Sequence, residues 1–203
     1  MRYRGEDGAV VPVANELVLP VGRPAVLRLT SPDVIHSFWV PALAGKTDMI
    51  PSRETVIVLE PTRTGVFRGA CAEYCGASHA LMSFAALVME PADYDAWLAR
   101  QAAPASPPAD PVAERGRAVF LEYGCGACHA IRGTEADGVV GPDLTHVGSR
   151  RTLAAGALPN TPDDYVRWIS DVHEVKPGAR MPAFGMLPEA DIAALALYLD
   201  GLT

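Results

Sequence analysis

Two cysteines, a histidine and a methionine lie within twelve residues and could together hold a soft metal ion. The segment 71–82 reads CAEYCGASHALM, and its four candidate ligands are Cys71, Cys75, His79 and Met82. A second histidine, His36, lies upstream in DVIHSFWVP. Thiolate, imidazole and thioether groups suit copper and are poor ligands for magnesium or calcium. The pattern therefore predicts a copper site.

The number of cysteines indicates how many copper ions this site holds. A mononuclear blue copper site uses one cysteine, two histidines and a weak methionine, and this chain supplies one cysteine more. Two thiolates can bridge two copper ions, which leaves one histidine and one weak ligand for each. Zinc bound by the two cysteines and two histidines is the chemical alternative. Two separate alternatives are that Met82 is a core residue and that His36 is a buried histidine without a metal.

A second pair of cysteines forms a haem attachment pattern. Residues 125–129 read CGACH, in which the thiols of Cys125 and Cys128 add to the haem vinyl groups and His129 is the iron ligand. A zinc or redox motif is the alternative, and in an exported chain the four cysteines could also form two disulfides. Electron-transfer haems commonly take a methionine as sixth ligand. We expect Met181, because prolines and a glycine stiffen its loop; the alternatives are Met186, His146 and His173.

Composition and charge exclude several classes of protein. The 203 residues are 49% hydrophobic and 20% charged, which is typical of a globular chain long enough for two domains. The sequence contains no long apolar run that could span a membrane and no export signal, so we expect a processed or truncated chain. Residues 101–203 hold 13 acidic and 8 basic residues. Nucleic acid is an improbable partner for such an acidic chain, whereas a basic protein is a plausible one.

Hydrophobic patterns divide the chain into two parts. Short apolar runs separated by turn residues predict strands at 17–19, 25–30, 55–59, 66–68 and 83–89, hence an antiparallel sandwich or barrel. Residues 101–111 contain four prolines and predict an extended spacer, with a closing helix before it at 91–100. Helical patterns follow at 112–123, after Thr161 and after Pro188.

Residues 1–100 resemble the copper A domain of cytochrome c oxidase subunit II. The matching stretches are HSFWVP at 36–41, KTDMIPSR at 46–53 and the whole 71–82 loop. The resemblance implies a cupredoxin-like Greek-key fold and a dinuclear copper A centre bridged by Cys71 and Cys75. It also implies that His36 and Met82 complete one copper, and that His79 and the backbone carbonyl of Glu73 complete the other.

Residues 112–203 resemble an all-α class I cytochrome c domain with one covalent haem c. The resemblance rests on an opening helix, the CGACH site, a Gly141-Pro142 loop, the Met181-Pro182 loop and a C-terminal helix. It implies that Gly116 and Phe120 contact the last helix and that the carbonyl of Pro142 accepts a hydrogen bond from the ring of His129. Arg150 and Trp168 are candidates for contacts with the haem propionates.

The order of the two domains resembles subunit II of caa-type oxidases, which carry a fused cytochrome c domain. The resemblance implies that electrons enter at the haem and pass through copper A to the catalytic subunit I, which reduces oxygen. It further implies a cytochrome c or another protein as electron donor. The location would be periplasmic, at the outer face of the bacterial cytoplasmic membrane. The membrane anchor that subunit II carries at its N-terminus is missing here, so we expect this fragment to be soluble.

Two other functions remain open from the sequence. A stand-alone two-centre carrier, or a part of a reductase for nitrous or nitric oxide, would carry the same two sites. A nitrous oxide reductase needs a further histidine-rich cluster, which five histidines cannot supply. A copper-storage module would hold labile, exposed copper and would leave the haem without a purpose.

Overall fold

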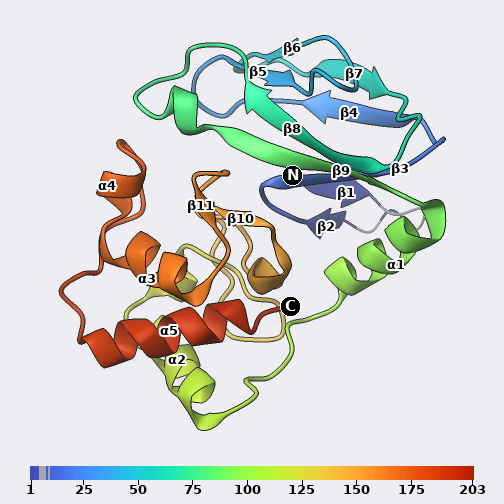
Figure 1. Cartoon of the computed structure of the whole chain (residues 1–203). Helices are drawn as coiled ribbons and strands as arrows, with labels where there is room; N and C mark the ends of the chain where they lie inside the picture. Colours follow the sequence, from blue (N-terminus) through green and yellow to red (C-terminus); the bar gives the residue numbers. More distant parts are fainter. Residues whose placement is uncertain (5–7, 9) are drawn as a thin grey trace. The chain divides into compact units, whose positions relative to one another are not determined.

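The computed structural model describes residues 1–4, 8 and 10–203, which form two compact units. One unit is rich in strands and comprises residues 15–98 and 155–157. The other is largely helical and comprises residues 1–14, 99–154 and 158–203 (Figure 1). Among the described residues, no helix has the length and apolar character needed to cross a membrane.

The strand-rich unit contains one five-stranded sheet and one two-stranded ladder. Its strands are β3 (Glu16–Pro20), β4 (Ala25–Leu29), β5 (His36–Trp39), β6 (Thr47–Met49), β7 (Thr55–Leu59), β8 (Gly65–Cys71) and β9 (Ser83–Met89). The five-stranded sheet has the order β3-β9-β8-β5-β6, and β4 pairs with β7 (Figure 1). The five strand runs predicted from the sequence are thus present. β5 and β6 were not predicted, since both are short and only partly apolar.

The core of this unit comes from side chains that alternate along the strands. In β4 and β7, which pair antiparallel, inward residues are more buried than their neighbours, and both strands end on a buried leucine. The buried apolar cluster comprises Leu17, Leu19, Leu29, Phe38, Val40, Leu59, Ala86 and Val88. This packing gives the unit a solid support for the loops at its edge.

The register of two strands brings the predicted copper ligands together. β5 and β8 are antiparallel, and Phe38 lies opposite Cys71. His36 begins β5 and Cys71 ends β8, so both lie at the same end of the sheet. The amide of Cys71 donates to the carbonyl of Met82 at 3.0 Å, which closes the 71–82 loop at its base.

The helical unit is built around two helices that cross closely. Its helices are α2 (Pro111–Glu122), α3 (Pro162–Ser170), α4 (Val172–Val175) and α5 (Glu189–Asp200), with single 3-10 turns η2 (Cys125–Ala127) and η3 (Val147–Ser149). Short antiparallel ladders join β1 (Arg2–Arg4) to β2 (Val10–Pro12) and β10 (Thr152–Leu153) to β11 (Leu158–Pro159). The prediction of an all-α domain did not include these ladders.

Gly116 allows α2 to approach α5 closely. A Cβ at this position would lie 2.1 Å from the carbonyl oxygen of Ala194, and therefore only glycine fits. One turn later Phe120 meets Tyr198 edge to face, with ring centroids 6.1 Å apart. The predicted contacts of Gly116 and Phe120 with the last helix are confirmed.

Capping residues fix where the helices begin. The side chain of Thr161 accepts a hydrogen bond from the amide of Asp164, and Pro162 occupies the first turn of α3. Asp110 caps α2 in the same way, accepting from the amides of Val112 and Ala113. The helix starts predicted near residues 112, 161 and 188 are confirmed.

The proline-rich segment lies against the helical unit. The helix α1 (Pro91–Ala102) runs into it, and its next residues are held by two side chains of that unit. The guanidinium of Arg132 donates to the carbonyls of Gln101 and Ala103, and the ring of the buried His146 approaches the carbonyl of Ala103 at 3.0 Å. In return the amide of Ala105 donates to the carbonyl of Arg132 at 2.8 Å. Residues 101–105 are therefore clamped rather than a free spacer.

Candidate metal and haem sites

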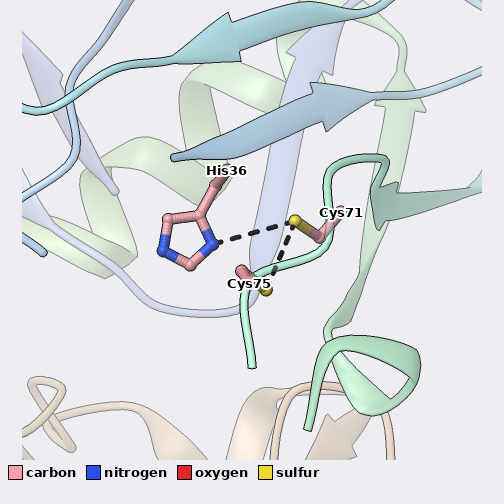
Figure 2. Close-up of side chains that lie close together, drawn as sticks. All are labelled: His36, Cys71 and Cys75. Carbon is pink, nitrogen blue, oxygen red and sulfur yellow. Dashed lines mark hydrogen bonds between the residues drawn. The ribbon is translucent and has the colours of Figure 1, made fainter. Parts of the chain in front are cut away.

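The two cysteines of the 71–82 loop face each other and a histidine. Cys71 Sγ lies 3.8 Å from Cys75 Sγ and 3.7 Å from His36 Nδ1 (Figure 2). The three ligand atoms all fall within 4.8 Å of one another. A disulfide needs about 2.05 Å between its sulfurs, and none of the four cysteines, all of which lie in the described residues, is in a disulfide. The predicted pair thus forms an open dithiol that can receive metal.

The remaining predicted ligands join the same cluster. Cys75 Sγ lies 3.5 Å from His79 Nδ1 and 3.9 Å from Met82 Sδ. The backbone carbonyl of Glu73 accepts from Cys71 Sγ at 3.3 Å. The 3-10 turn η1 (His79–Leu81) brings His79 and Met82 back toward the loop, since the amide of Met82 donates to the carbonyl of His79. Every ligand predicted for copper therefore contacts one of the two sulfurs.

Local hydrogen bonds favour the thiolate form of Cys71. Burial raises the pKa of this thiol, but hydrogen bonds with the backbone of Ser37 and Glu73 and with the side chains of His36 and Cys75 lower it to about 7. Burial lowers the pKa of His36. Its hydrogen bonds to Cys71 and Asp33 raise that pKa by more, so that the net pKa is raised. The lowered pKa makes the Cys71 thiolate readily available to a soft metal ion, whereas His36 must give up its proton when it binds one.

Asp33 is a functional candidate that the sequence analysis missed. Its carboxylate lies 3.1 Å from His36 Nε2, and this contact turns the other ring nitrogen, Nδ1, toward Cys71. A carboxylate behind a metal-binding histidine commonly fixes the ring and raises its basicity. The sequence offered one indication of its role, since Asp33 lies three residues before the predicted ligand His36.

The donor set suits copper better than zinc. Two thiolates, two imidazoles, a thioether and a carbonyl converge on one loop and one strand. A thioether and two bridging sulfurs are typical of copper, whereas a zinc site would use four nitrogen and sulfur ligands and leave Met82 unused. The residues present thus fit a dinuclear copper centre.

A tight turn presents the haem attachment residues. Gly124, in a left-handed conformation with φ of 74°, leads into η2, and the amides of Cys128 and His129 both donate to the carbonyl of Cys125. Cys125 is half-buried and Cys128 is exposed. Burial raises the pKa of the Cys125 thiol.

The ring of His129 is held for binding through one nitrogen. Its Nδ1 lies 2.8 Å from the carbonyl oxygen of Pro142, as predicted. Burial lowers the pKa of His129, and Arg150 lowers it further while the Pro142 carbonyl opposes both. The ring is therefore neutral at neutral pH, and Nε2 is the nitrogen available to a metal. This donor set of one imidazole beside two thiols fits a covalently bound haem.

The structure does not decide the sixth haem ligand. Met181 lies half-buried in the loop between α4 and α5, and no contact links it to His129 among those described. The rival His146 is buried and engaged with the carbonyl of Ala103. Arg150 lies near His129, since it lowers that pKa, and its guanidinium donates to the carbonyl of Asp143. Met181 and the propionate contacts of Arg150 and Trp168 remain predictions.

Comparison with known proteins assigns a family to each half of the chain. Residues 4–89 match the family "Cytochrome C oxidase subunit II, periplasmic domain", and residues 113–203 match the family "Cytochrome c". The chain joins a cytochrome c oxidase subunit II domain to a cytochrome c domain. We call residues 4–89 the subunit II domain and residues 113–203 the cytochrome c domain.

Curated relatives match the chain along most of its length. The chain is 42% identical over 188 residues to cytochrome c oxidase subunit 2 of Alkalihalophilus pseudofirmus, covering 93% of this chain and 54% of that protein. It is 36% identical over 200 residues to the subunit 2 of Bacillus sp. strain PS3, covering 93% and 56%. The chain thus spans about half the length of the curated relatives it matches.

A solved structure resembles the subunit II domain. The crystal structure of the periplasmic domain of subunit II of cytochrome oxidase of Bradyrhizobium japonicum is 38% identical, with a TM-score of 0.42, and the match covers 43% of this chain and 64% of that chain.

Proposed function

We propose that this chain is the electron-input part of a respiratory haem–copper cytochrome c oxidase. Electrons are accepted at haem c in the cytochrome c domain and passed through dinuclear copper A to a catalytic subunit that reduces oxygen. One observation supports this most strongly: two imidazoles, a thioether and a backbone carbonyl contact the facing thiols of Cys71 and Cys75 in a chain that also carries the predicted haem attachment turn.

Within this proposal each predicted ligand has a place at copper. Cys71 and Cys75 bridge the two ions; His36 and Met82 complete one, and His79 and the Glu73 carbonyl complete the other. When bound, the paired copper supplies a one-electron carrier in which the charge is shared over two metals, so little reorganisation accompanies transfer. Asp33 orients His36, and the packed sheet beneath β5 and β8 holds the loop in place.

The cytochrome c domain holds its cofactor with four residues in this proposal. Cys125 and Cys128 attach the haem, His129 binds the iron through Nε2, and Met181 is the sixth ligand. The Pro142 carbonyl fixes the ring of His129 and increases the basicity of the imidazole.

The family likeness also supports a proposal for the partners and the location of the chain. Its partners are the membrane catalytic subunit I and a cytochrome c or other electron-donor protein, and nucleic acid plays no part. The site of action is the outer face of a bacterial cytoplasmic membrane. We also propose a Greek-key cupredoxin domain at 1–100 and a class I cytochrome c domain at 112–203, joined by the proline-rich segment 101–111, of which residues 101–105 are held against the helical unit.

The metal content and its spectroscopy test the proposal. We expect two copper ions and one iron per chain, and a seven-line copper hyperfine pattern in low-temperature electron paramagnetic resonance. Cys75→Ser should abolish that pattern and leave the haem absorption spectrum intact. Zinc as the resident ion, or a disulfide between Cys71 and Cys75 in the fully metallated protein, would contradict the proposal.

Rapid kinetics separate electron transfer from copper storage. Reduction of the haem by a protein donor should be followed by reduction of copper within the same chain. Copper that never changes its oxidation state would instead indicate a storage module.

A further inference from the structure

The residue that follows Pro142 is held through its carboxylate and its backbone. Asp143 Oδ2 accepts a hydrogen bond from the guanidinium of Arg132 at 2.7 Å, and Oδ1 accepts one from the amide of Thr145 at 2.9 Å. The carbonyl of Asp143 accepts from Arg150. Only 11% of the Asp143 side chain and 26% of the Arg132 side chain are exposed. Breaking an ion pair that is shielded from water costs more than breaking one on the surface, because the remaining charge is left without a partner.

This anchor affects His129 because the proline between them cannot anchor itself. Pro142 has no amide hydrogen, and its carbonyl is the group that lies 2.8 Å from Nδ1 of His129. The direction of that carbonyl is consequently set by the residues on either side. On one side the amide of Gly141 donates to the carbonyl of Cys128 at 2.7 Å. On the other side the anchor is the side chain of Asp143.

The side chain of Arg132 connects this anchor to the proline-rich segment. Its second terminal nitrogen donates to the carbonyls of Gln101 and Ala103. In return the amide of Ala105 donates to the carbonyl of Arg132 at 2.8 Å. The planar guanidinium presents five N–H donors in a fixed fork, so it can bond a carboxylate on one side and backbone carbonyls on the other. The carbonyls of the proline-rich segment thus keep the guanidinium turned toward Asp143.

The backbone of Arg132 is fixed as well. Its amide donates to the hydroxyl of Thr145, which is fully buried, at 2.9 Å. Two residues earlier the carbonyl of Ala130 accepts from the amide of Leu144 at 2.8 Å. The guanidinium therefore extends from a backbone that is already bonded to the loop that it anchors.

We propose that Arg132 is a positioning residue for the haem ligand His129 and that the proline-rich segment is part of the haem site. The connection runs from the carbonyls of that segment through Arg132 and Asp143 to the carbonyl of Pro142, and from there to the imidazole ring. This inference rests on the proposed function, because it takes His129 as the ligand of the haem iron.

The expected consequence is a reduction potential that depends on this connection. The hydrogen bond to the Pro142 carbonyl increases the charge that the imidazole of His129 can donate, which favours ferric over ferrous iron. A carbonyl that is free to turn weakens this bond, so the reduction potential rises. An ion pair that served stability alone would lower the thermal midpoint when broken and would leave the reduction potential unchanged.

The test compares Arg132→Gln with Arg117→Gln in the haem-loaded full chain. Arg117 is the matched control, because it forms an ion pair of the same length, 2.7 Å, with Glu114, and its side chain is 33% exposed. At a fixed applied potential, Arg132→Gln should raise the ratio of ferrous to ferric haem about threefold, which corresponds to about 28 mV. The effect is limited because the bond from Arg150 to the Asp143 carbonyl remains. Arg117→Gln should leave the ratio unchanged.

A conservative variant tests the role of the ion pair. Arg132→Lys retains the positive charge opposite Asp143 but lacks the fork that also reaches the carbonyls of the proline-rich segment. Its reduction potential should therefore lie between those of the wild type and Arg132→Gln. A potential for Arg132→Lys equal to that of Arg132→Gln would overturn the role of the pair with Asp143.

Two insertions into the full chain test the role of the proline-rich segment. A Gly-Ser pair inserted between Gln101 and Ala102 displaces the carbonyls that Arg132 contacts, and it should raise the ratio of ferrous to ferric haem. The same pair inserted between Pro107 and Pro108 leaves those carbonyls in place and should not change the ratio. Equal reduction potentials for the two insertions would show that the segment has no part in the haem site.

A second measurement reports the hydrogen bond itself. The exchange of the His129 Nδ1 proton with water, followed by NMR in the ferrous protein, should be several-fold faster in Arg132→Gln than in Arg117→Gln. If Arg132→Gln lowers the thermal midpoint but keeps the wild-type potential and exchange rate, Arg132 is structural only and the proposal is wrong. If potential and exchange change as expected but copper stays oxidised after the haem is reduced, the proposed electron path is wrong and the positioning role stands.

Discussion

Replacing Gly141 with alanine should disturb the haem ligand His129 directly. A Cβ at Gly141 would lie 2.3 Å from Cε1 and 2.6 Å from Nδ1 of the His129 ring, and ordinary contact begins at 3.4 Å. The ring or the loop must therefore shift by about 1.1 Å, the difference between these two values. The ring is held by its bond to the Pro142 carbonyl at 2.8 Å, and a shift of this size stretches that bond beyond hydrogen-bond length.

The cost can be estimated from two contributions. Overpacking in a rigid site costs about 1–3 kcal/mol, and a lost hydrogen bond costs about 1 kcal/mol. We therefore expect Gly141→Ala to lower the free energy of unfolding by about 2–4 kcal/mol. In a domain of this size the thermal midpoint falls by about 4–8 °C per kcal/mol, so the expected decrease is at least about 8 °C. The reduction potential of the haem should rise, because the His129 ring without its hydrogen bond to the Pro142 carbonyl donates less charge to ferric iron.

The assay compares the variant with a glycine replacement that the structure tolerates. Gly201→Ala places its Cβ at ordinary distance, 3.4 Å from the nearest atom, in the same unit and at φ of −73°. Thermal unfolding of the haem-loaded protein, followed at the Soret band, gives the midpoints, and a spectroelectrochemical titration gives the potential. Equal thermal midpoints for Gly141→Ala and Gly201→Ala would show that the loop around Gly141 moves freely. The close approach of Gly141 to the ring would then have no role in holding His129.

Three further perturbations follow from the structure. Gly116→Ala should destabilise the helical unit by about 1–3 kcal/mol in denaturant unfolding, because its Cβ would overlap backbone atoms of α5, whereas Gly201→Ala should be close to neutral; equal stability would refute the close packing of the helices. In the reduced protein without metal, the rate at which Cys71 is alkylated, measured by mass spectrometry, should rise with pH and reach half its maximum near pH 7. Cys125 should stay protonated and react slowly through pH 8, since its pKa is raised. Equal alkylation rates of the two thiols at pH 7 would contradict this. Asp33→Asn should lower the pKa of the neighbouring histidine, as seen by NMR titration, and weaken copper binding by about tenfold or more in competition with a chelator; unchanged affinity would remove Asp33 from the site.

The residues proposed as copper ligands could be grouped from the sequence because soft metal ions accept few kinds of side chain. Cys71, Cys75, His79 and Met82 lie on one loop, so their spacing alone brings the donors within reach. His36 could be predicted only through its flanking residues, since the register that places β5 beside β8 is a long-range property. Met181 was predicted from the prolines and the glycine beside it, and its role stays a prediction.

Other features depend on contacts between residues that lie far apart in the sequence, and local sequence patterns do not predict such contacts. β5 and β6 are short and partly polar, and the sheet forms them because β8 offers an edge that must be paired. The clamp on residues 101–105 requires Arg132 and His146, which lie about thirty to forty residues away along the chain. A stretch with several prolines resembles a spacer in any sequence, and only the distant donors fix it.

The clamp changes the meaning of the proline-rich stretch for protein engineering. Residues 101–105 are bonded to the helical unit at one end of the stretch, and Asp110 caps a helix of the same unit at the other. Residues 106–109 are consequently a surface bulge of that unit rather than a tether. Extra residues inserted there would enlarge the bulge at a small entropic cost. An excised cytochrome c module should start before Gln101, because a cut at 111 would remove the carbonyls of Gln101 and Ala103 that Arg132 and His146 contact.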